Sequence, residues 1–312
     1  MPLGYGDMML IDSHTHLGGF PAIEELADSM RTRNDIASWR TTYPEIFARI
    51  QQEEPSDNSA ALLEAMNLNG IDIAVVQPTV GISNEFVSSI ARRHPGRFVP
   101  LASATEWPWA PDPRAPLPDA KVPEHVARIA DRAVNELGFA GIGETNTQIM
   151  TAHVDPRLVA ADFGPLMDVL APRRLPIQLP TGWTQFPGNL HYQDPLWVDE
   201  LAARHPDVPI ILTKMGRSIQ RYFDSCLTVA LRNRNVYLDI VGTSADHLRT
   251  ALNALGPDRI MFGTDWSYTW RYLSAPDDVH STARRLVEAA MVTKDEAAGI
   301  FERTARTVFA ID

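Results

Sequence analysis

The sequence predicts an α/β protein built as a (β/α)8 barrel. Eight short apolar segments alternate with helical patterns along 312 residues, an order typical of a parallel sheet. Eight such units are the number found in a (β/α)8 barrel, which typically has about 250 residues. An open doubly wound sheet is the alternative, but no Gly-x-Gly-x-x-Gly phosphate turn follows any of the strands.

Each expected strand is a mainly apolar run that ends in polar or turn residues. The expected strands cover 8–13, 71–77, 97–104, 139–144, 175–180, 208–214, 235–240 and 259–264. The expected helices cover 59–67, 84–93, 124–137, 162–170, 196–204, 222–232, 245–255, 279–291 and 294–309. Because no linker divides the chain, residues 1–312 are expected to form one domain with a loop insertion at about 18–58.

Composition narrows the class of partner. The net charge is -11 and no Lys/Arg cluster stands out, which argues against a nucleic-acid ligand. No apolar run approaches the roughly 20 residues of a membrane span, and no signal-peptide pattern begins the chain. The single cysteine, Cys226, excludes an intrachain disulfide. We therefore expect a cytoplasmic protein with a small-molecule substrate.

The first strand leads into a His-x-His pair. Side chains at i and i+2 of a strand point the same way, so His14 and His16 are expected to project together. Two imidazoles held in this way can bind one metal ion.

Polar residues also end several later strands. In a barrel, chemistry takes place at the carboxyl ends of the strands, so these side chains are candidates for the active site. They are Gln77, Glu106, Glu144, Gln178, Lys214 and Asp265. Asp239 ends the seventh strand, but we expect it to point into a neighbouring loop as a cap or turn residue.

Six stretches together resemble a known family. They are IDSHTHLG at 11–18, LPIQLPTGW at 175–183, VPIILTKMGR at 208–217, NVYLDIVG at 235–242, GPDRIMFGTDW at 256–266 and IFERTARTVFAI at 300–311. The sequence resembles the amidohydrolase superfamily, in the branch of aminocarboxymuconate-semialdehyde decarboxylase and the aromatic acid decarboxylases. The resemblance implies a (β/α)8 barrel, a homodimer and a mononuclear metal site with His14, His16 and Asp265. In that family the aspartate that Asp265 matches binds metal or transfers protons.

Two positions depart from the family pattern. Pro180 stands where the family has a metal-binding histidine, and Lys214 stands where it has a catalytic histidine. Three alternatives follow. Glu144, in a Gly-Glu motif similar to that of TatD-type nucleases, completes a site for Zn²⁺ or Mn²⁺ with His14, His16 and Asp265. A loop histidine, His153 or His191, replaces the lost ligand. Otherwise the site works without metal, as in proteins similar to pyrone-dicarboxylate lactonase.

Lys214 has several predicted roles. It acts as a base or nucleophile, binds a substrate carboxylate together with Arg217, or forms an ion pair with Glu144 or Asp265. Aromatic residues after strand ends suit a planar ligand. The predicted substrate-binding residues are Arg217, Trp183, Trp266 and Gln178.

These observations favour an enzyme. Asp265, Lys214, His14 and His16 are expected to catalyse hydrolysis, decarboxylation or a specialised cyclisation or rearrangement of a small unsaturated or carboxylated molecule. The alternative is an inactive barrel that binds a ligand or partner. His14, His16 and Asp265 within hydrogen-bond reach around one cavity would favour the enzyme, whereas a pocket filled by Trp266 or Lys214 would favour the binding barrel.

Overall fold

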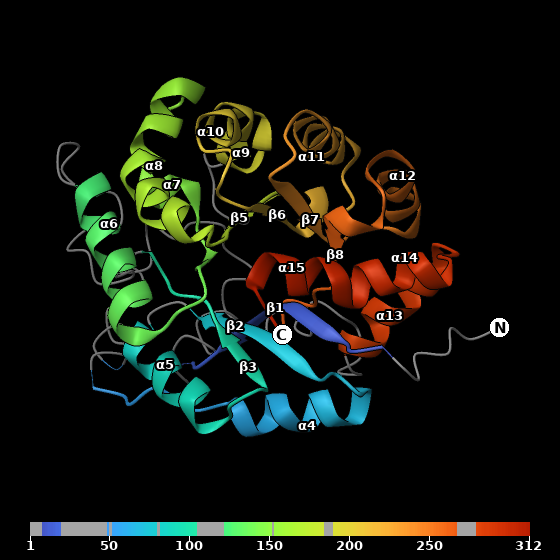
Figure 1. Cartoon of the computed structure of the whole chain (residues 1–312), viewed down its shortest axis with the longest axis horizontal. Coiled ribbons are helices and arrows are strands. Elements are labelled where there is room, and N and C mark those ends of the chain that lie inside the picture. The colour runs from blue at the N-terminus through green and yellow to red at the C-terminus, as the bar shows by residue number, and fades with distance from the viewer. Residues whose placement is uncertain are drawn as a thin grey trace.

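The computed structural model describes residues 8–19, 49, 52–79, 82–104, 122–151, 153–183, 190–266 and 279–312. Strands and helices alternate along these residues, and the helices surround the strands (Figure 1). The strands are β1 Ile11–Leu17, β2 Ile73–Pro78, β3 Phe98–Pro100, β4 Ile142–Glu144, β5 Ile177–Pro180, β6 Ile210–Thr213, β7 Val236–Asp239 and β8 Ile260–Met261. The helices are α4 Ser59–Asn69, α5 Asn84–Arg93, α6 Val122–Arg132, α7 Thr147–Met150, α8 Pro156–Leu170, α9 Leu190–Gln193, α10 Val198–Arg204, α11 Gln220–Arg232, α12 Ala245–Leu255, α13 Val279–Ala289, α14 Lys294–Ala298 and α15 Thr304–Phe309.

All pairs of named strands are parallel, and backbone hydrogen bonds outside these ladders close the two seams of the barrel. The ladders run β1-β2-β3 and β4-β5-β6-β7-β8. At one seam, Ala102 N–H donates to Gly141 O (2.9 Å) and Gly143 N–H donates to Ala102 O (2.8 Å). At the other, Ser13 N–H donates to Phe262 O (2.9 Å). The (β/α)8 barrel is confirmed, and the open sheet is excluded.

The last helix fills the amino-terminal end of the barrel. Ala305, Val308 and Phe309 pack against an inner cluster contributed by the strands and the loop after β3. That inner cluster comprises Ile11, Ile73, Val75, Leu101, Ile211 and Met261. A larger outer cluster, which includes Leu10 and Leu17, lies between strands and helices. Because apolar side chains occupy the amino-terminal end, the polar side chains of the strands gather at the carboxyl ends.

The strand positions were predicted better than the strand lengths. The expected first strand stopped at residue 13, whereas β1 continues to Leu17. The expected eighth strand ran to residue 264, whereas β8 ends at Met261. After Met261 the backbone no longer pairs with β7 and instead forms hydrogen bonds with β1. The apolar sequence therefore extends further than the strand.

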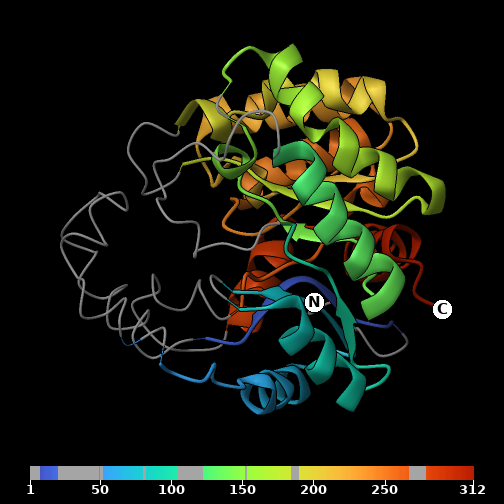
Figure 2. The ribbon, with the colours of Figure 1, turned by 90° about the vertical axis from the view of Figure 1, so that its left-hand side faces the viewer.

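The predicted insertion at about 18–58 lies largely outside the described residues. Its two ends are joined: Gly19 and Ser56 form an isolated antiparallel bridge, and Gly18 N–H donates to Asn58 Oδ1 (2.8 Å). Figure 2 shows the described helices packed around the barrel from the side. The single-domain prediction stays a prediction.

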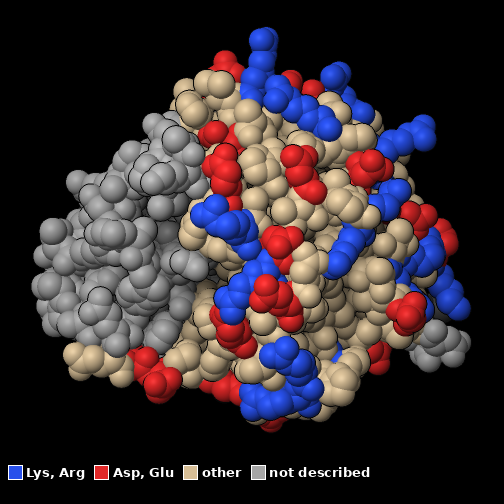
Figure 3. Space-filling model, turned by 60° about the vertical axis from the view of Figure 1, so that its left-hand side comes forward, with Lys and Arg blue, Asp and Glu red and all other residues tan. Residues whose placement is uncertain are grey.

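Charges on the described surface are mixed. On the face in Figure 3, acidic and basic side chains are interspersed. Across the described ranges, none of the helices is long and apolar enough to cross a membrane.

Candidate active site

His14 and His16 both point into the barrel because β1 contains an irregularity that begins before them. The pairing of β1 with β2 shifts register between Asp12 and Thr15. Ile11 belongs to the inner cluster, whereas Leu10 and Leu17 belong to the outer one, so the shift reverses which alternate residues face inward. The two imidazole centroids are 5.3 Å apart, which confirms that the pair projects together.

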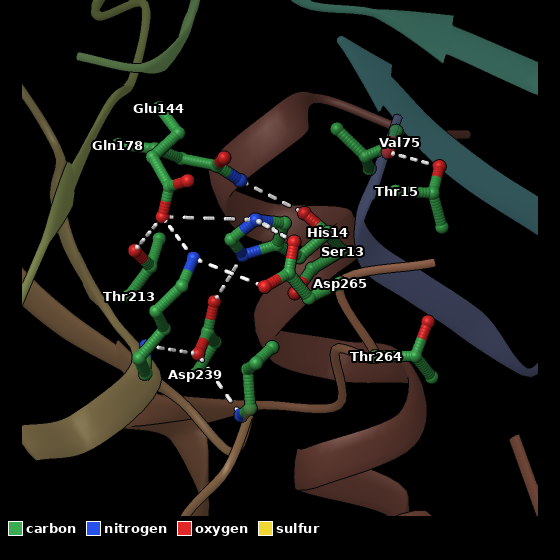
Figure 4. Close-up of polar contacts among 12 residues, drawn as sticks. Ser13, His14, Thr15, Val75, Glu144, Gln178, Thr213, Asp239, Thr264 and Asp265 are labelled. Carbon is green, nitrogen blue, oxygen red and sulfur yellow. Dashed lines mark hydrogen bonds and ion pairs between the residues drawn. The ribbon is translucent and has the colours of Figure 1, made fainter. Parts of the chain in front are cut away.

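Asp265 meets these histidines from the end of β8. Its backbone is left-handed (φ 58°), a conformation that costs a non-glycine residue about 1–2 kcal/mol. Asp265 N–H donates to His14 O (2.8 Å), which holds that conformation. Asp265 Oδ1 then lies 3.0 Å from His16 Nε2 and 3.6 Å from His14 Nε2. The three residues predicted to form the centre are therefore together, and Figure 4 shows His14 beside Asp265.

Glu144 enters from the end of β4. Its backbone N–H donates to Gln77 Oε1, and Gln77 Nε2 lies 3.4 Å from His16 Nε2. A Cβ at residue 143 would overlap the Gln77 amide, so Gly143 is required for this close approach. Glu144 Oε1 accepts a hydrogen bond from Thr213 Oγ1 (2.8 Å) and lies 3.9 Å from His14 Nε2.

Lys214 reaches the two carboxylates from a strained turn after β6. The five residues from Lys214 to Ser218 all have positive φ, between 38° and 77°. Gly216 tolerates this where a side chain would not, because a Cβ there would lie 2.5 Å from Phe223 N. The turn directs Lys214 Nζ to Glu144 Oε1, with which it forms an ion pair, and to within 3.3 Å of Asp265 Oδ2. The predicted ion pair of Lys214 is confirmed with both partners.

The expectation that Asp239 serves as a turn residue is correct for Oδ1 only, which binds the backbone two residues further on and in the neighbouring turn after β6. Oδ1 accepts hydrogen bonds from the N–H of Lys214 (2.6 Å) and of Val241 (3.1 Å). The other oxygen was not foreseen as a site contact: the side chain is fully buried, and Asp239 Oδ2 lies 2.8 Å from His14 Nδ1. A short polar residue at a strand end resembles a cap in the sequence, and only the closed barrel brings the end of β7 within reach of His14 on β1.

Charges set the protonation of this cluster. Burial opposes ionisation of Glu144, but the charges of Lys214 and His14 lower its pKa to about 2. The pKa of Asp265 is also held well below its usual value, by Lys214 and by the hydrogen bond to His16. Burial and Lys214 oppose protonation of His14, yet Asp239, Glu144 and Asp265 together raise its pKa. The two carboxylates are therefore ionised at neutral pH.

Four of these residues fit a metal ion. Ligand atoms of His14, His16, Glu144 and Asp265 all lie within 4.8 Å of one another. His14 Nε2 is buried and makes no hydrogen bond within the described part of the chain. Mixed imidazole and carboxylate ligands suit Zn²⁺ or Mn²⁺.

Lys214 and a metal ion would meet different oxygens of Asp265 but the same face of Glu144, because Glu144 Oε1 pairs with Lys214 and is also the oxygen nearest His14 Nε2. The two oxygens of Asp265 face different partners: Oδ1 faces the imidazoles and Oδ2 faces Lys214. Around His14, three carboxylates and one ammonium leave a formal charge of −2 when the imidazoles are neutral. A divalent cation would neutralise that charge, so the donor set and the charge both fit a metal.

The loop histidines lie elsewhere. His153 Nδ1 is 2.9 Å from Asp162 Oδ2, and the His191 ring contacts the Tyr192 ring at a centroid distance of 3.8 Å. Neither belongs to the four-residue cluster. Glu106, the candidate after the third strand, lies outside the described residues.

The predicted substrate-binding residues have different surroundings. The Arg217 guanidinium lies 5.1 Å from the centre of the Trp183 ring, and that indole is 39% exposed. Gln178 is fully buried and donates from Nε2 to Ser13 O (2.8 Å). The Trp266 side chain packs against the outer cluster. Substrate binding by these residues stays a prediction.

Two further polar residues were missed. Asp12 Oδ1 accepts hydrogen bonds from the N–H of His14 and of Thr264 (3.1 Å each), and Oδ2 accepts one from Thr264 Oγ1 (2.6 Å). His280, on α13, is fully buried with Nε2 3.1 Å from Asp12 Oδ2. The position of Asp12 two residues before His14 was the available signal, whereas nothing in the α13 sequence marks His280.

Comparison with known proteins places the chain among related barrels. The amidohydrolase family profile matches residues 11–311. The 5-carboxyvanillate decarboxylase of Sphingomonas paucimobilis has a similar structure, with 18% identity, a TM-score of 0.62, and 98% of this chain and 100% of that chain covered. A manganese-bound 5-carboxyvanillate decarboxylase of Novosphingobium aromaticivorans gives 17% identity and a TM-score of 0.63, covering 99% and 98% of the two chains.

Another similar structure is named as a hydrolase. A putative 2-pyrone-4,6-dicarboxylic acid hydrolase of Pseudomonas putida gives 18% identity and a TM-score of 0.59, with coverage of 97% and 98%. No curated protein sequence matches the chain.

Proposed function

The chain belongs to the amidohydrolase family, and we propose that it is an enzyme which transfers protons on a small carboxylated, unsaturated molecule. One observation carries the proposal: the carboxylate of Asp265 lies between His16, at 3.0 Å, and Lys214, at 3.3 Å, at the carboxyl ends of the strands. Lys214 and the hydrogen bond to His16 keep this buried carboxylate ionised, which is the protonation state that a general base requires. An inactive binding barrel would not require such a cluster.

Each residue has a distinct task in this proposal. Asp265, ionised at rest, takes a proton from water or from an acidic substrate hydroxyl and returns it to the leaving group or to carbon. Lys214 holds Asp265 and Glu144 ionised and attracts an anionic substrate group. Such acid–base steps serve hydrolysis and decarboxylation alike.

A divalent ion fits the same residues. His14, His16, Asp265 and Glu144 would hold it, and when bound it supplies a Lewis acid that polarises a substrate oxygen. Asp239 at His14 Nδ1 resembles the carboxylate partners that orient metal-binding histidines in other proteins.

The substrate class rests on two supports. The similar structures named above are decarboxylases or a hydrolase of carboxylated aromatic or pyrone compounds. Arg217 over Trp183 pairs a cation with a flat apolar surface, which suits a planar carboxylate. Both residues stay predictions as substrate contacts.

The test is metal content and turnover in parent and Glu144→Gln. We expect about one Zn²⁺ or Mn²⁺ per parent chain and a lower content in the variant. Turnover would be assayed as CO₂ release from hydroxybenzoates and as ring opening of pyrone carboxylates. Glu200→Gln, which changes a half-exposed partner of Arg204, is the matched control and should retain both.

Two results would change this view. Turnover without metal would assign the cationic role to Lys214 alone. No turnover of any compound in the panel, together with binding of one of them, would favour the inactive barrel.

Location and assembly complete the proposal. We place the protein in the cytoplasm as a homodimer without a nucleic-acid ligand. The net charge of -11 argues against a nucleic-acid ligand. The single buried thiol of Cys226 is compatible with the reducing cytoplasm. Light scattering after size exclusion tests the dimer.

A further inference from the structure

We propose that Asp239 is the positioning residue of the site: it holds His14 in the tautomer that directs the lone pair of Nε2 toward Asp265 and Glu144. The expected effects on metal affinity and turnover rest on the proposed function, whereas the tautomer of His14 follows from the observed contacts alone. Asp239 belongs to β7, which none of the predicted site residues occupies.

The first support is the contact with His14. Asp239 Oδ2 lies 2.8 Å from His14 Nδ1, and both side chains are fully buried. An ionised carboxylate has no proton to donate, so the hydrogen must lie on Nδ1. In the neutral imidazole, Nε2 is then the atom with the lone pair. That atom faces Asp265 Oδ1 at 3.6 Å and Glu144 Oε1 at 3.9 Å.

The second support is the use of the other oxygen. Asp239 Oδ1 accepts two backbone hydrogen bonds, from Lys214 N–H and Val241 N–H. These bonds fix which oxygen faces His14, because backbone N–H groups cannot turn away. The Lys214 bond also holds the first residue of the left-handed turn that directs Lys214 into the site. Asp239 thus joins the histidine of β1 to the lysine that follows β6.

This arrangement makes Asp239→Asn a selective test. The amide oxygen must stay with the two backbone N–H donors, since the amide nitrogen cannot accept from them. The amide NH₂ group then faces His14 Nδ1, which has to become the acceptor. His14 must therefore carry its hydrogen on Nε2, although the volume and backbone bonds of residue 239 are unchanged.

The direct readout is the ¹⁵N signal of the His14 ring, measured at alkaline pH so that the imidazole is neutral, and assigned with His14→Asn. We expect a protonated Nδ1 in the parent and a protonated Nε2 in Asp239→Asn. We also expect metal affinity to fall by about 10- to 100-fold in the variant, and turnover to fall by about 100-fold or more. A protonated Nε2 in the parent overturns the inference without any variant, so a variant that fails to fold leaves the test intact.

Asp12→Asn is the matched control. Asp12 also accepts two backbone N–H groups on one oxygen and faces an imidazole, His280, with the other. We expect the same loss of a buried charge to leave the His14 tautomer unchanged. An identical change of the His14 signals in both variants would overturn the inference.

The outcomes separate the two proposals. A change of tautomer in a protein that holds no metal and turns over none of the compounds would uphold the role of Asp239 in orienting His14 and contradict the proposed function. An unchanged tautomer in Asp239→Asn would contradict the role of Asp239 whatever the activity.

Discussion

Asp12 on β1 and Asp239 on β7 are buried carboxylates with the same pattern of contacts. Each accepts two backbone N–H groups on Oδ1 and faces an imidazole nitrogen with Oδ2. The distances to the imidazoles are also close: 3.1 Å from Asp12 to His280 and 2.8 Å from Asp239 to His14. Each aspartate also joins its own strand to another segment of the chain.

The difference lies in what each aspartate holds. Asp12 ties the His14 backbone to Thr264, next to Asp265, and its imidazole belongs to α13. Asp239 faces the side chain of His14, in the site itself. The same local chemistry therefore stabilises the framework in one region and orients a reactive group in the other. The two aspartates are alike in burial and in backbone hydrogen bonds, so the role of each depends on the imidazole that its Oδ2 faces.

Removing each carboxylate should have the largest effect on stability. Asp239→Ala and Asp12→Ala each leave two backbone N–H groups unpaired, and each should lower the free energy of unfolding by about 3–5 kcal/mol. Chemical denaturation measures this loss. The two variants are expected to lose similar free energies of unfolding. A loss below about 1 kcal/mol in either variant would show that the two aspartates are not equivalent.

Replacing Lys214 should change how the stability of the protein depends on pH, through Glu144 in the site. Glu144 has a folded pKa of about 2, below its unfolded value, so it contributes stability above about pH 4.5 that is lost as the pH falls toward 2. Lys214→Met removes the main charge that lowers this pKa. The variant should be less stable than the parent at pH 7 by about 3 kcal/mol, and the difference should shrink below pH 4.5.

The measurement is the Tm of the parent and of Lys214→Met between pH 3 and pH 8. A constant difference for Lys214→Met would show that the pKa of Glu144 does not depend on Lys214.

Two threonines give the smallest expected effects. Thr213→Val removes a hydrogen bond to Glu144 Oε1, and Thr264→Val removes one to Asp12 Oδ2. Each should cost about 1–2 kcal/mol in unfolding free energy. Only Thr213→Val should change metal affinity, by a few-fold in a competition titration with a chelator. Equal metal affinities in both variants would show that the hydrogen bond from Thr213 to Glu144 does not matter for metal binding.

The fold was predictable because its signals are local. Apolar runs and helical patterns follow from side-chain periodicity, and α5 and α12 have the predicted bounds. The ends of β1 and β8 were not predictable. The register shift of β1 arises in its pairing with β2, and the left-handed Asp265 depends on its hydrogen bond to His14 on β1.

The sequence alone determined the barrel and the candidate set of His14, His16, Glu144, Lys214 and Asp265. Spacing within one strand and position at strand ends are enough to select such residues. Only the tertiary structure decided that Asp239 belongs to the site, at His14 Nδ1, and that Lys214 lies between two carboxylates. Closure of the barrel brings together residues more than 200 positions apart, and one sequence carries no record of that distance.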